Sequence, residues 1–586
     1  MKMDHEQQMA QAEEVLGDRL HEVGFAKGLF FGQYLGKKLL PYPNLERDPR
    51  ATKMVADLRR YCHEHIDAAA IDRDSEIPQH VIDGLGKLGL LGACLPAEFG
   101  GGGFDQTSYC RMLEVLGGHC GGTALFVNAH HSIGPRALVL FGTPEQQAYS
   151  LPKMATGDWI SAFALTEPEA GSDAANVQTM AVPSPDNKGF ILNGQKRWIT
   201  NGGIAHGLTV MARTPVPGSK DTKITAFLVT PEMPGFEVVE KRMPKCGVRG
   251  TATSRLAFNN MFVPKENVLG ELGKGLRVAL TVLDFGRTTF GATCTGAAKF
   301  CIERATKHAL SRVQFGQPLA NFELVKDKLA YMQAGAYAME SATYETAALI
   351  DSGEGDFMLE TAMLKVFSTD VLWRIINDTI QIFGGKAYFS DEPYERMMRD
   401  ARINMIGEGA NDVLRVFTAL VGMRDVGLEL KSVLDAAKKP LSNLGKLGGF
   451  AGRKLESMFS SPSVDVHHSE LEPDAVRLGK LVGTFGGQVE AVLRRYQESI
   501  LDSQYVLGRI ADCANELYVG ACVLRRLDRM LGQGPLDAAR KLELQTGRYY
   551  LTTAARRIHH SLDALWVNDD DETSRLADAV LAAYRV

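Results

Sequence analysis

The chain is organised around the run Arg399-Asp400-Ala401-Arg402-Ile403-Asn404-Met405-Ile406-Gly407-Glu408-Gly409-Ala410-Asn411-Asp412-Val413-Leu414-Arg415. One carboxylate, Glu408, stands between two glycines, with apolar residues before it and a helix-like run after it. Because Asn411 and Asp412 are residue types that cap helix N-termini, Glu408 is predicted to lie on a tight turn where a helix begins. A carboxylate in mostly apolar surroundings has a raised pKa, which suits a general base. A solvated glutamate in a glycine-rich turn is the alternative interpretation.

Length and composition limit the class of protein. A chain of 586 residues exceeds what one hydrophobic core supports, which predicts three or four domains. The composition, 45% hydrophobic and 23% charged, is ordinary for a soluble globular protein, and the net charge of −5 gives no overall attraction to nucleic acid. No apolar run is long enough to span a membrane. Residues 1–20 resemble neither a signal nor a transit peptide, so a cytoplasmic location is expected.

Cysteine and histidine spacing argues against disulfide or metal chemistry. The nine cysteines form no CxxC pair, and their scattered positions indicate reduced core thiols. Neighbouring residues on a helix do not face one target, so no metal site is predicted from the adjacent histidine pairs 130/131, 467/468 and 559/560.

Hydrophobic periodicity predicts an α+β fold that is mainly α. In the middle of the chain, short runs rich in Val, Ile, Thr and Phe alternate with turn residues, which indicates an antiparallel β-domain. The parts before and after it carry apolar residues at helical spacing. The predicted segments are an N-terminal segment 1–50, a helical domain 51–157, the β-domain 158–271, a helical bundle 272–428, a basic amphipathic and linker segment 429–473, and a C-terminal helical module 474–586.

Two segments of the β-domain are typical of turns around a polar group. They are Phe163–Asp173 and Lys196–Gly203. Each offers hydroxyls and free backbone N–H groups around glycines, which suits the polar edge of a cofactor. Trp198 adds a flat apolar face. A pair of ordinary hairpin turns is the alternative.

Three features of the helical region could serve a site. Asp284 and Arg287 share one face of a helix, so Arg287 either orients the site or forms an ordinary intrahelical salt bridge. Arg312–Gly316 combines an arginine, an amide and an aromatic ring, which suits a pyrophosphate or a ring, although a simple helix end is equally consistent. Gln381–Gly385 allows close approach of its backbone through two glycines.

A basic segment precedes the C-terminal module. Residues 431–454 hold six Lys or Arg against one acid, with leucines interleaved. This mixture predicts a peripheral amphipathic segment that meets anionic lipid at the inner face of the membrane; a surface loop is the alternative, because its glycines disfavour a helix. The segment lacks the stacking aromatics of single-strand binders, so no nucleic-acid partner is predicted. From residue 507 to 524 a heptad-like apolar repeat indicates a small helical bundle.

Five motifs in one order carry a resemblance to a known family. They are Thr-Glu-Pro-Glu-Ala-Gly-Ser-Asp (166–173), Trp-Ile-Thr-Asn-Gly-Gly (198–203), Arg-Val-Gln-Phe-Gly (312–316), Gln-Ile-Phe-Gly-Gly (381–385) and Glu-Gly-Ala-Asn-Asp (408–412). With them the sequence resembles the acyl-CoA dehydrogenase family, in the long form of its very-long-chain members. The resemblance implies the acyl-CoA dehydrogenase fold: an N-terminal helical domain, a middle antiparallel β-domain and a C-terminal helical bundle, plus an extra C-terminal helical domain.

The resemblance also implies a flavoenzyme, with FAD between the β-domain and the middle helices. The residues expected to line the isoalloxazine are Phe163, Leu165, Thr166, Trp198 and Thr200. Those expected to reach the pyrophosphate and adenine end, from the neighbouring subunit of a homodimer, are Arg312, Gln314, Phe315, Gln381, Gly384 and Gly385. Ala410 and Asp412, just after the base, are expected at the cofactor as well.

The chemistry follows from the same resemblance. Glu408 would remove the α-proton of an acyl-CoA while a hydride leaves the β-carbon for flavin N5, which gives a trans-2-enoyl-CoA. The thioester oxygen would accept hydrogen bonds from the backbone N–H of Glu408 and from a ribityl hydroxyl of FAD. Electrons would pass to an electron-transfer flavoprotein. The substrate contacts implied are Ser172, Asp284, Arg287, Gly407 and Gly409.

Two positions near the base depart from the family pattern. Gly407 stands where Tyr or Phe usually precedes the base, and Ala410 stands where Thr usually follows it. The space at Gly407 leads to the hypothesis that the acyl group of the substrate is branched or otherwise bulky. The resemblance to very-long-chain members of the family further suggests that this acyl group is long. Isovaleryl-CoA dehydrogenases carry their base at the position of Gly286, so Glu408 is the candidate base here.

Two rival functions stay open on the sequence alone. An acyl-CoA oxidase performs the same chemistry with oxygen as the acceptor, and aerobic peroxide production would distinguish it. Some long-form relatives act as assembly factors for respiratory complexes and dispense with flavin, so a copurifying yellow flavin would distinguish that scaffold role. The motifs around Glu408 and the flavin favour the dehydrogenase.

Overall fold

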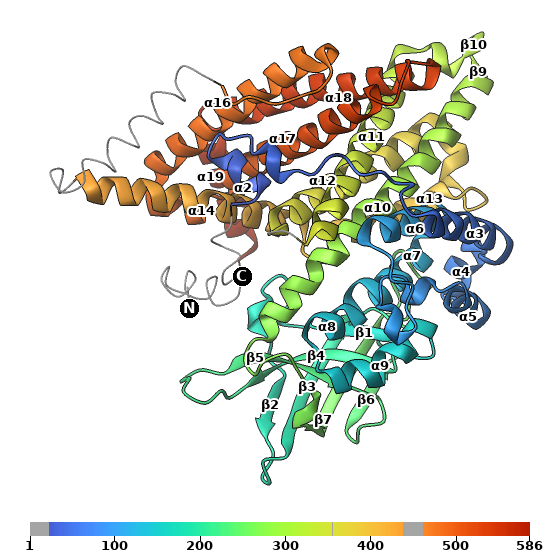
Figure 1. The fold of residues 1–586 in the computed structure, drawn as a ribbon, viewed down its shortest axis with the longest axis vertical. Coiled ribbons are helices and arrows are strands. Elements are labelled where there is room, and N and C mark those ends of the chain that lie inside the picture. The colour runs from blue at the N-terminus through green and yellow to red at the C-terminus, as the bar shows by residue number, and fades with distance from the viewer. Residues whose placement is uncertain (1–22, 354–355, 438–460, 586) are drawn as a thin grey trace. The chain divides into compact units, whose positions relative to one another are not determined.

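A computed structural model describes residues 23–353, 356–437 and 461–585 of the chain (Figure 1). The chain divides into two compact units. The first comprises Pro43–Ala410, and the second combines Glu22–Tyr42 with Asn411–Val586. Part of the predicted N-terminal segment 1–50 therefore belongs with the C-terminal helices.

Helices form the N-terminal part of the first unit. Several begin at side-chain caps: Asp48 accepts a hydrogen bond from the backbone N–H of Arg50, and Thr143 and Gln146 form a capping box. One segment, η5 (Asn128–Ile133), is π-helical. The α-helices are α3 (Pro49–His65), α4 (Ala68–Asp74), α5 (Gln79–Lys87), α6 (Gln106–His119), α7 (Gly121–Val127), α8 (Gly134–Phe141) and α9 (Pro144–Thr156).

A β-domain follows these helices. Its strands are β1 (Ser161–Ala164), β2 (Met180–Pro183), β3 (Gly189–Ile199), β4 (Gly207–Thr214), β5 (Lys223–Val229), β6 (Phe236–Glu240), β7 (Ser254–Pro264) and β8 (Val268–Leu269). The strand order is β6-β7-β3-β2-β4-β5-β8, and β1 pairs with β4. Most neighbouring strands are antiparallel, as predicted, whereas β1 and β2 pair with β4 in parallel.

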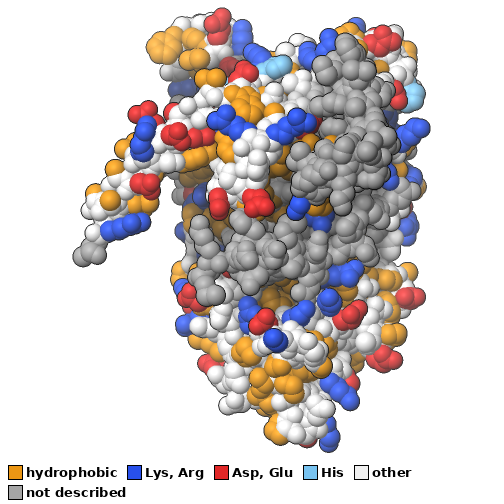
Figure 2. Space-filling view, turned by 90° about the vertical axis from the view of Figure 1, so that its left-hand side faces the viewer, with side chains coloured by type: hydrophobic (Ala, Val, Ile, Leu, Met, Phe, Trp, Pro, Cys, Tyr) orange, Lys and Arg blue, Asp and Glu red, His pale blue; other side chains and the backbone are white. Residues whose placement is uncertain are grey.

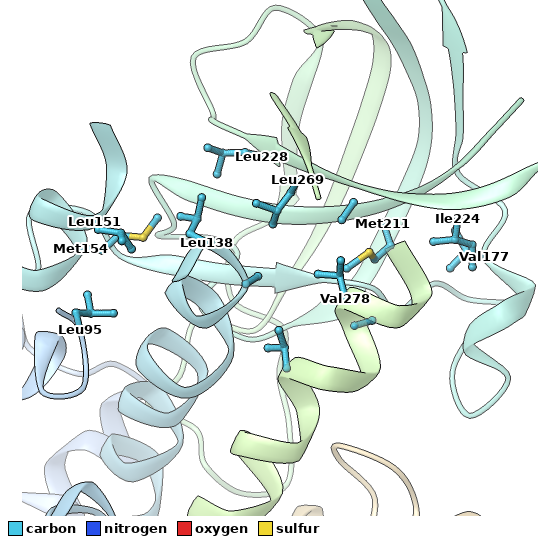
Figure 3. Packing of buried hydrophobic residues seen from close by; sticks show 14 of the residues in the cluster. Leu95, Leu138, Leu151, Met154, Val177, Met211, Ile224, Leu228, Leu269 and Val278 are labelled. Atoms are coloured by element: carbon cyan, nitrogen blue, oxygen red, sulfur yellow. The ribbon is translucent and has the colours of Figure 1, made fainter. Parts of the chain in front are cut away.

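A buried cluster fixes the sheet against the helices. Figure 3 shows it, with Leu138 of α8 and Met154 of α9 in the same cluster as Met211 of β4. Val278, in the first turns of α10 (Gly275–Ser311), packs there too. Full burial of one such side chain contributes about 1.5–3 kcal/mol. The cluster therefore packs the first turns of α10 against the sheet.

The long helix α10 leads from the sheet to the rest of the first unit. It packs against α6, α11 (Glu323–Ser352) and α12 (Met358–Phe383), as Figure 1 shows. It ends before Arg312, where a two-stranded hairpin follows. That hairpin and the elements up to Glu408 are β9 (Val313–Gln314), β10 (Gln317–Pro318), η9 (Gly384–Tyr388), α13 (Tyr394–Arg402) and η10 (Ile403–Met405).

The second unit is a helical bundle built from both ends of the chain. Its first helix, α2 (Phe25–Phe30), is buried throughout, and the ring of Phe30 lies 5.3 Å from that of Phe485 between centroids. A Cβ on Gly422 would lie 2.3 Å from the Phe30 ring, so this packing requires glycine. The other helices are α14 (Asn411–Ala437), α16 (Glu472–Tyr496), α17 (Gln504–Leu531), α18 (Ala538–Asp563) and α19 (Asp570–Tyr584).

The predicted fold class, α+β and mainly α with an extra C-terminal helical domain, is confirmed. Asn411 begins α14, so it and Asp412 lie within the first turn of that helix and not before it. α14 also continues past the predicted boundary at residue 428. Residues 438–454 of the basic segment lie outside the described residues. The nine cysteines are unpaired, and all except Cys94 and Cys246 are buried.

The described surface carries charges of both signs. On the face seen in Figure 2, acidic and basic side chains are interspersed with apolar ones. Across residues 23–353, 356–437 and 461–585, every helix is too short or too polar for a bilayer span.

Candidate active site

The turn at Glu408 has a strained backbone that neighbouring side chains hold in place. Glu408 has φ +55°, in the left-handed region that costs a non-glycine residue about 1–3 kcal/mol. The guanidinium Nε of Arg287 donates to the carbonyl oxygen of Glu408 at 3.4 Å. The ammonium of Lys365 donates to the carbonyl oxygen of Gly409 at 2.7 Å. These two bonds fix the direction in which the Glu408 side chain leaves the turn.

The carboxyl group of Glu408 is poised between its two protonation states. Its Oε1 accepts a hydrogen bond from the side-chain amide of Asn128 at 3.3 Å. Its Oε2 is buried and has no hydrogen-bond partner among the residues that the structure describes. Burial raises the pKa of Glu408 to about 7, while the charges of Lys365 and Arg287 limit the rise. A buried carboxylate with one free oxygen and a pKa near neutrality can act as a general base.

Arg287 makes the intrahelical salt bridge that the sequence allowed and also contacts the turn of Glu408. Its guanidinium lies 3.0 Å from the carboxylate of Asp284, one turn away on α10, and both side chains are buried. Asp284 also accepts a hydrogen bond from the hydroxyl of Thr361 at 3.1 Å. The salt bridge therefore holds Arg287 in the orientation from which it contacts Glu408.

Two glycines define the space beside the carboxylate. A Cβ on Gly286 would lie 2.4 Å from Oε2 of Glu408, so any larger residue there would displace the carboxyl group. A Cβ on Gly407 would contact only the carbonyl oxygen of Ile403, at 3.6 Å. The position before Glu408 therefore has open space, where a side chain would fit.

A buried ion pair holds the two turn segments of the β-domain together. Lys196 and Glu167 are both buried, with 2.6 Å between Nζ and Oε1. The same ammonium donates to the carbonyl oxygen of Leu165 at 3.0 Å, and the backbone N–H of Arg197 donates to that of Thr166 at 3.0 Å. Phe163, Leu165 and Thr166 thus lie beside the segment that carries Trp198 and Thr200.

Trp198 presents an aromatic surface on a constrained backbone. It has φ +60° next to a register shift between β3 and β7, and 51% of the residue is exposed. Asn201, three residues on, also has positive φ, and its buried amide donates to the carbonyl oxygen of Phe126 at 3.1 Å. Strained residues that the surrounding structure holds in place are typical of ligand sites.

The second group of predicted cofactor residues lies far from Glu408. Arg312 follows Arg287 by 25 residues along α10, which corresponds to about 37 Å of helix. All six members are exposed: Arg312, Gln314, Phe315, Gln381, Gly384 and Gly385. Phe315 is 95% exposed and has φ +51° in the hairpin after α10. One copy of the chain does not bring this group to the base.

The remaining predicted residues stand apart from these contacts. Ser172 is exposed in the loop after β1, and Asp412 is exposed in the first turn of α14. Ala410 follows Gly409 and supplies no polar side chain.

Two residues at the site were missed by the sequence analysis. Asn128 comes from η5, 280 positions before the base, and no local pattern marks it. Lys365 is fully buried in α12. A lone lysine within the apolar run 362–367 was a usable signal, because a buried ammonium must find a partner.

A cavity extends from Asn128 into the helices of the first unit. Most of its lining is apolar and comes from α6, α7, α10, α12 and α13, while Asp400 and Asn404 add polar atoms. Its apolar and small residues include Gly117, Gly121, Ala124, Leu125, Phe290, Ala297, Leu372 and Ile376. Such a lining suits a hydrocarbon chain.

Family models match almost the whole described chain. The N-terminal, middle and C-terminal domains of acyl-CoA dehydrogenase match residues 49–158, 162–261 and 273–420. The C-terminal domain described as ACAD9/ACADV matches residues 469–585.

Individual relatives agree with these matches. The human mitochondrial very long-chain specific acyl-CoA dehydrogenase is 38% identical over 92% of this chain and 84% of its own length. The probable acyl-CoA dehydrogenase FadE10 of Mycobacterium tuberculosis is 32% identical over 99% of this chain and 92% of its own. The solved acyl-CoA dehydrogenase from Bacillus anthracis, complexed with FAD, superimposes with a TM-score of 0.77 at 27% identity, covering 94% of this chain and 91% of that one. The chain belongs to the acyl-CoA dehydrogenase family, in the long form that adds a C-terminal helical domain.

Proposed function

We propose that this enzyme removes the α-proton of a long-chain acyl-CoA with Glu408 and releases a trans-2-enoyl-CoA. The observation that carries the proposal is the buried carboxyl group of Glu408, whose pKa is about 7 and whose Oε2 has no partner among the described residues. A base in this state is ionised for a large share of the time at neutral pH and still holds an abstracted proton well.

The residues of the β-domain fit FAD as the cofactor. The half-exposed ring of Trp198, held on a strained backbone, offers a flat surface, and the hydroxyls of Thr166 and Thr200 lie on adjoining segments. Phe163 and Leu165 complete this proposed isoalloxazine site. When bound, FAD supplies the acceptor for the hydride that leaves the β-carbon of the substrate.

The backbone at Glu408 would stabilise the charge that develops when the α-proton leaves. Its N–H makes no hydrogen bond to any described residue, so it can donate to the thioester oxygen. Arg287 and Lys365 keep this N–H in place by bonding the neighbouring carbonyl groups. The apolar cavity beyond Asn128 would accept the acyl chain and exclude water.

A homodimer would complete the cofactor site. The exposed group from Arg312 to Gly385 lies too far along α10 to meet the β-domain residues of its own chain, and Phe315 is almost fully exposed. We assign this group to the FAD of a second copy. Electrons would leave through an electron-transfer flavoprotein, and the basic segment 431–454 would contact anionic lipid at the inner face of the membrane.

Anaerobic flavin bleaching tests the proposal. The purified protein is expected to be yellow and to lose its flavin absorbance within seconds when mixed with a saturated long-chain acyl-CoA, whereas free CoA leaves it unchanged. A colourless protein that FAD does not reconstitute would favour the scaffold role. Stoichiometric peroxide in air, with no need for a protein acceptor, would favour the oxidase.

Gly407 offers a prediction about the substrate. Because a Cβ there meets only the carbonyl oxygen of Ile403, Gly407→Phe is expected to fold and to fill the space beside the reacting carbons. The ratio of kcat/KM for a 2-methyl-branched over a straight-chain acyl-CoA should fall about 10-fold or more, as expected for loss of room for one methyl group. Gly407→Ala serves as the matched control and should leave the ratio within about 3-fold. An unchanged ratio in Gly407→Phe would refute the hypothesis.

A further inference from the structure

Asn128 connects the base to the interior of the first unit. It is the first residue of the π-helical segment η5, and only 3% of it is exposed. Its Nδ2 lies 3.3 Å from Oε1 of Glu408. On the other side, its Oδ1 accepts a hydrogen bond from the hydroxyl of Thr289 on α10. Single-turn π-helical segments occur frequently at functional sites.

Thr289 contacts the far end of the amide. It is fully buried, and its hydroxyl lies 3.4 Å from that of Ser132, four residues after Asn128 in the same π-helical segment. An amide carbonyl can only accept, and an amide NH₂ can only donate. An ionised carboxylate can only accept, so the NH₂ group of Asn128 faces Glu408 and Oδ1 is turned to the hydroxyl of Thr289. That hydroxyl also lies 2.8 Å from the carbonyl oxygen of Gly286.

We propose that Asn128 is a positioning residue for the base: its amide holds Oε1 of Glu408, so that Oε2 is left for the α-proton, and Thr289 holds the amide. This inference rests on the proposed role of Glu408. It assigns to the pair a function that neither the motifs nor the cavity alone indicated. In this arrangement Oε1 is bonded, while the buried Oε2 has no hydrogen-bond partner among the described residues.

The charged groups around Glu408 cannot replace this bond. Lys365 approaches from α12 and donates to the carbonyl oxygen of Gly409, and Arg287 approaches from α10 and donates to that of Glu408. Asp284, behind Arg287, is neutralised by the salt bridge. Among the described residues, the amide of Asn128 is therefore the one group that donates to the carboxyl group itself. Because a donor favours the ionised form, its loss must make Glu408 easier to protonate.

Two substitutions and a matched control test this role. Asn128→Leu removes the donor and keeps the side-chain size. Thr289→Val removes the hydroxyl that holds the amide. Thr295→Val is the control, because Thr295 is also a buried α10 threonine, whose hydroxyl bonds the carbonyl oxygen of Gly291 and does not contact the pair. Thermal unfolding of all three reports any general loss of stability.

The readouts separate positioning from packing. In Asn128→Leu, the acid limb of kcat/KM against pH should move upward by about half a unit to one unit, and in Thr289→Val by about half as much. Thr295→Val should leave the limb in place. In Asn128→Leu, kcat should fall about 10- to 100-fold with KM within about 3-fold, because a loosely held base spends less time in the reactive geometry.

A direct titration of the Glu408 carboxyl group, which does not depend on turnover, tests whether Asn128 positions it. The ¹³C carboxyl resonance of Glu408, assigned by its absence in Glu408→Gln, should titrate at higher pH in Asn128→Leu than in the native enzyme. An unchanged midpoint would overturn the proposal, whatever happens to activity. If Asn128→Leu does not fold, an equal midpoint in Thr289→Val and Thr295→Val would overturn it instead. Turnover retained by Glu408→Gln would refute the base assignment, which is a separate failure.

Discussion

Glu408→Gln is expected to lower kcat by about 10²–10⁴-fold, because it removes the buried general base and general-base catalysis contributes about that much. The amide keeps the shape of the side chain, and its oxygen can still accept from Asn128. FAD and the acyl-CoA should therefore bind with affinities close to native. Stopped-flow flavin reduction, with ligand binding measured separately by a spectral shift, distinguishes lost chemistry from lost binding.

The same substitution makes a prediction about pH. The native kcat/KM should fall as the pH drops below about 7, because burial raises the pKa of Glu408 to about 7 and only the ionised form accepts the α-proton. In Glu408→Gln the residual rate should lose this acid limb. Gly286→Glu in a Glu408→Ala background tests for rescue, because alanine vacates the place where Oε2 now lies and a side chain at 286 would reach it. It should restore part of the rate. A native profile that stays flat down to pH 5 would contradict the assignment.

Glu408→Gln, which lowers activity, is expected to raise the stability of the fold above pH 7. The pKa of Glu408 is raised above the ordinary value of 4.5, so between pH 4.5 and 7 the folded protein binds more protons than the unfolded chain. The free energy of unfolding therefore falls as the pH rises through this window. Glu408→Gln carries no charge and should be more stable than the native protein at pH 8, by about 3 kcal/mol at most. Urea unfolding at pH 5 and pH 8 would measure the difference, which should be smaller at pH 5.

What the sequence predicts well at this site is local. Glu408 on its turn is marked by its two flanking glycines, and the Asp284–Arg287 salt bridge by spacing along one helix. These features depend on residues within a few positions of one another, so periodicity and turn chemistry describe them. The left-handed backbone of Glu408, with φ +55°, is of the same kind, since it belongs to the glycine-flanked turn itself.

What the sequence does not predict depends on contacts between distant residues. Asn128 meets Glu408 across 280 positions, and its π-helical geometry leaves no periodic signature. α2 is buried among the C-terminal helices because Gly422 leaves room for Phe30, a fit that neither segment shows alone. The parallel pairing of β1 with β4 likewise depends on the order of strands in the sheet, which the β-propensity of each strand does not reveal.

Lys196→Met is expected to destabilise the protein by about 3–5 kcal/mol, because it leaves the buried carboxylate of Glu167 without its counter-ion. Burial alone would raise the pKa of Glu167, yet Lys196 and the N–H groups of Gln178 and Thr179 outweigh burial and hold it below its ordinary value. Burial lowers the pKa of Lys196 to about 8 against the pull of Glu167. The buried carboxylate of Glu167 and the buried ammonium of Lys196 are therefore each stabilised in the charged form by the other.

Lys196→Met is also expected to weaken the binding of FAD. Nζ of Lys196 donates to the carbonyl oxygen of Leu165, the residue before Thr166. Lys196 lies on β3, and Trp198 follows it two residues later on the same strand. Without the pair, the two segments proposed to line the isoalloxazine lose their common anchor. Lys196→Met should therefore lose flavin on gel filtration and melt at a lower temperature even when saturated with FAD.

The control variants separate the buried pair from a generic loss of charge. Lys307→Met removes one partner of the exposed pair with Glu303 on α10 and should leave the stability almost unchanged, because water screens an exposed ion pair. Glu167→Gln in the Lys196→Met background removes the orphaned charge and keeps an oxygen for the N–H groups of Gln178 and Thr179, so it should recover part of the stability. If the double variant is no more stable than Lys196→Met, the loss comes from packing of the lysine stem and not from an uncompensated carboxylate. If it regains stability but not flavin, the ammonium bond to Leu165 is the contact that aligns the cofactor segments.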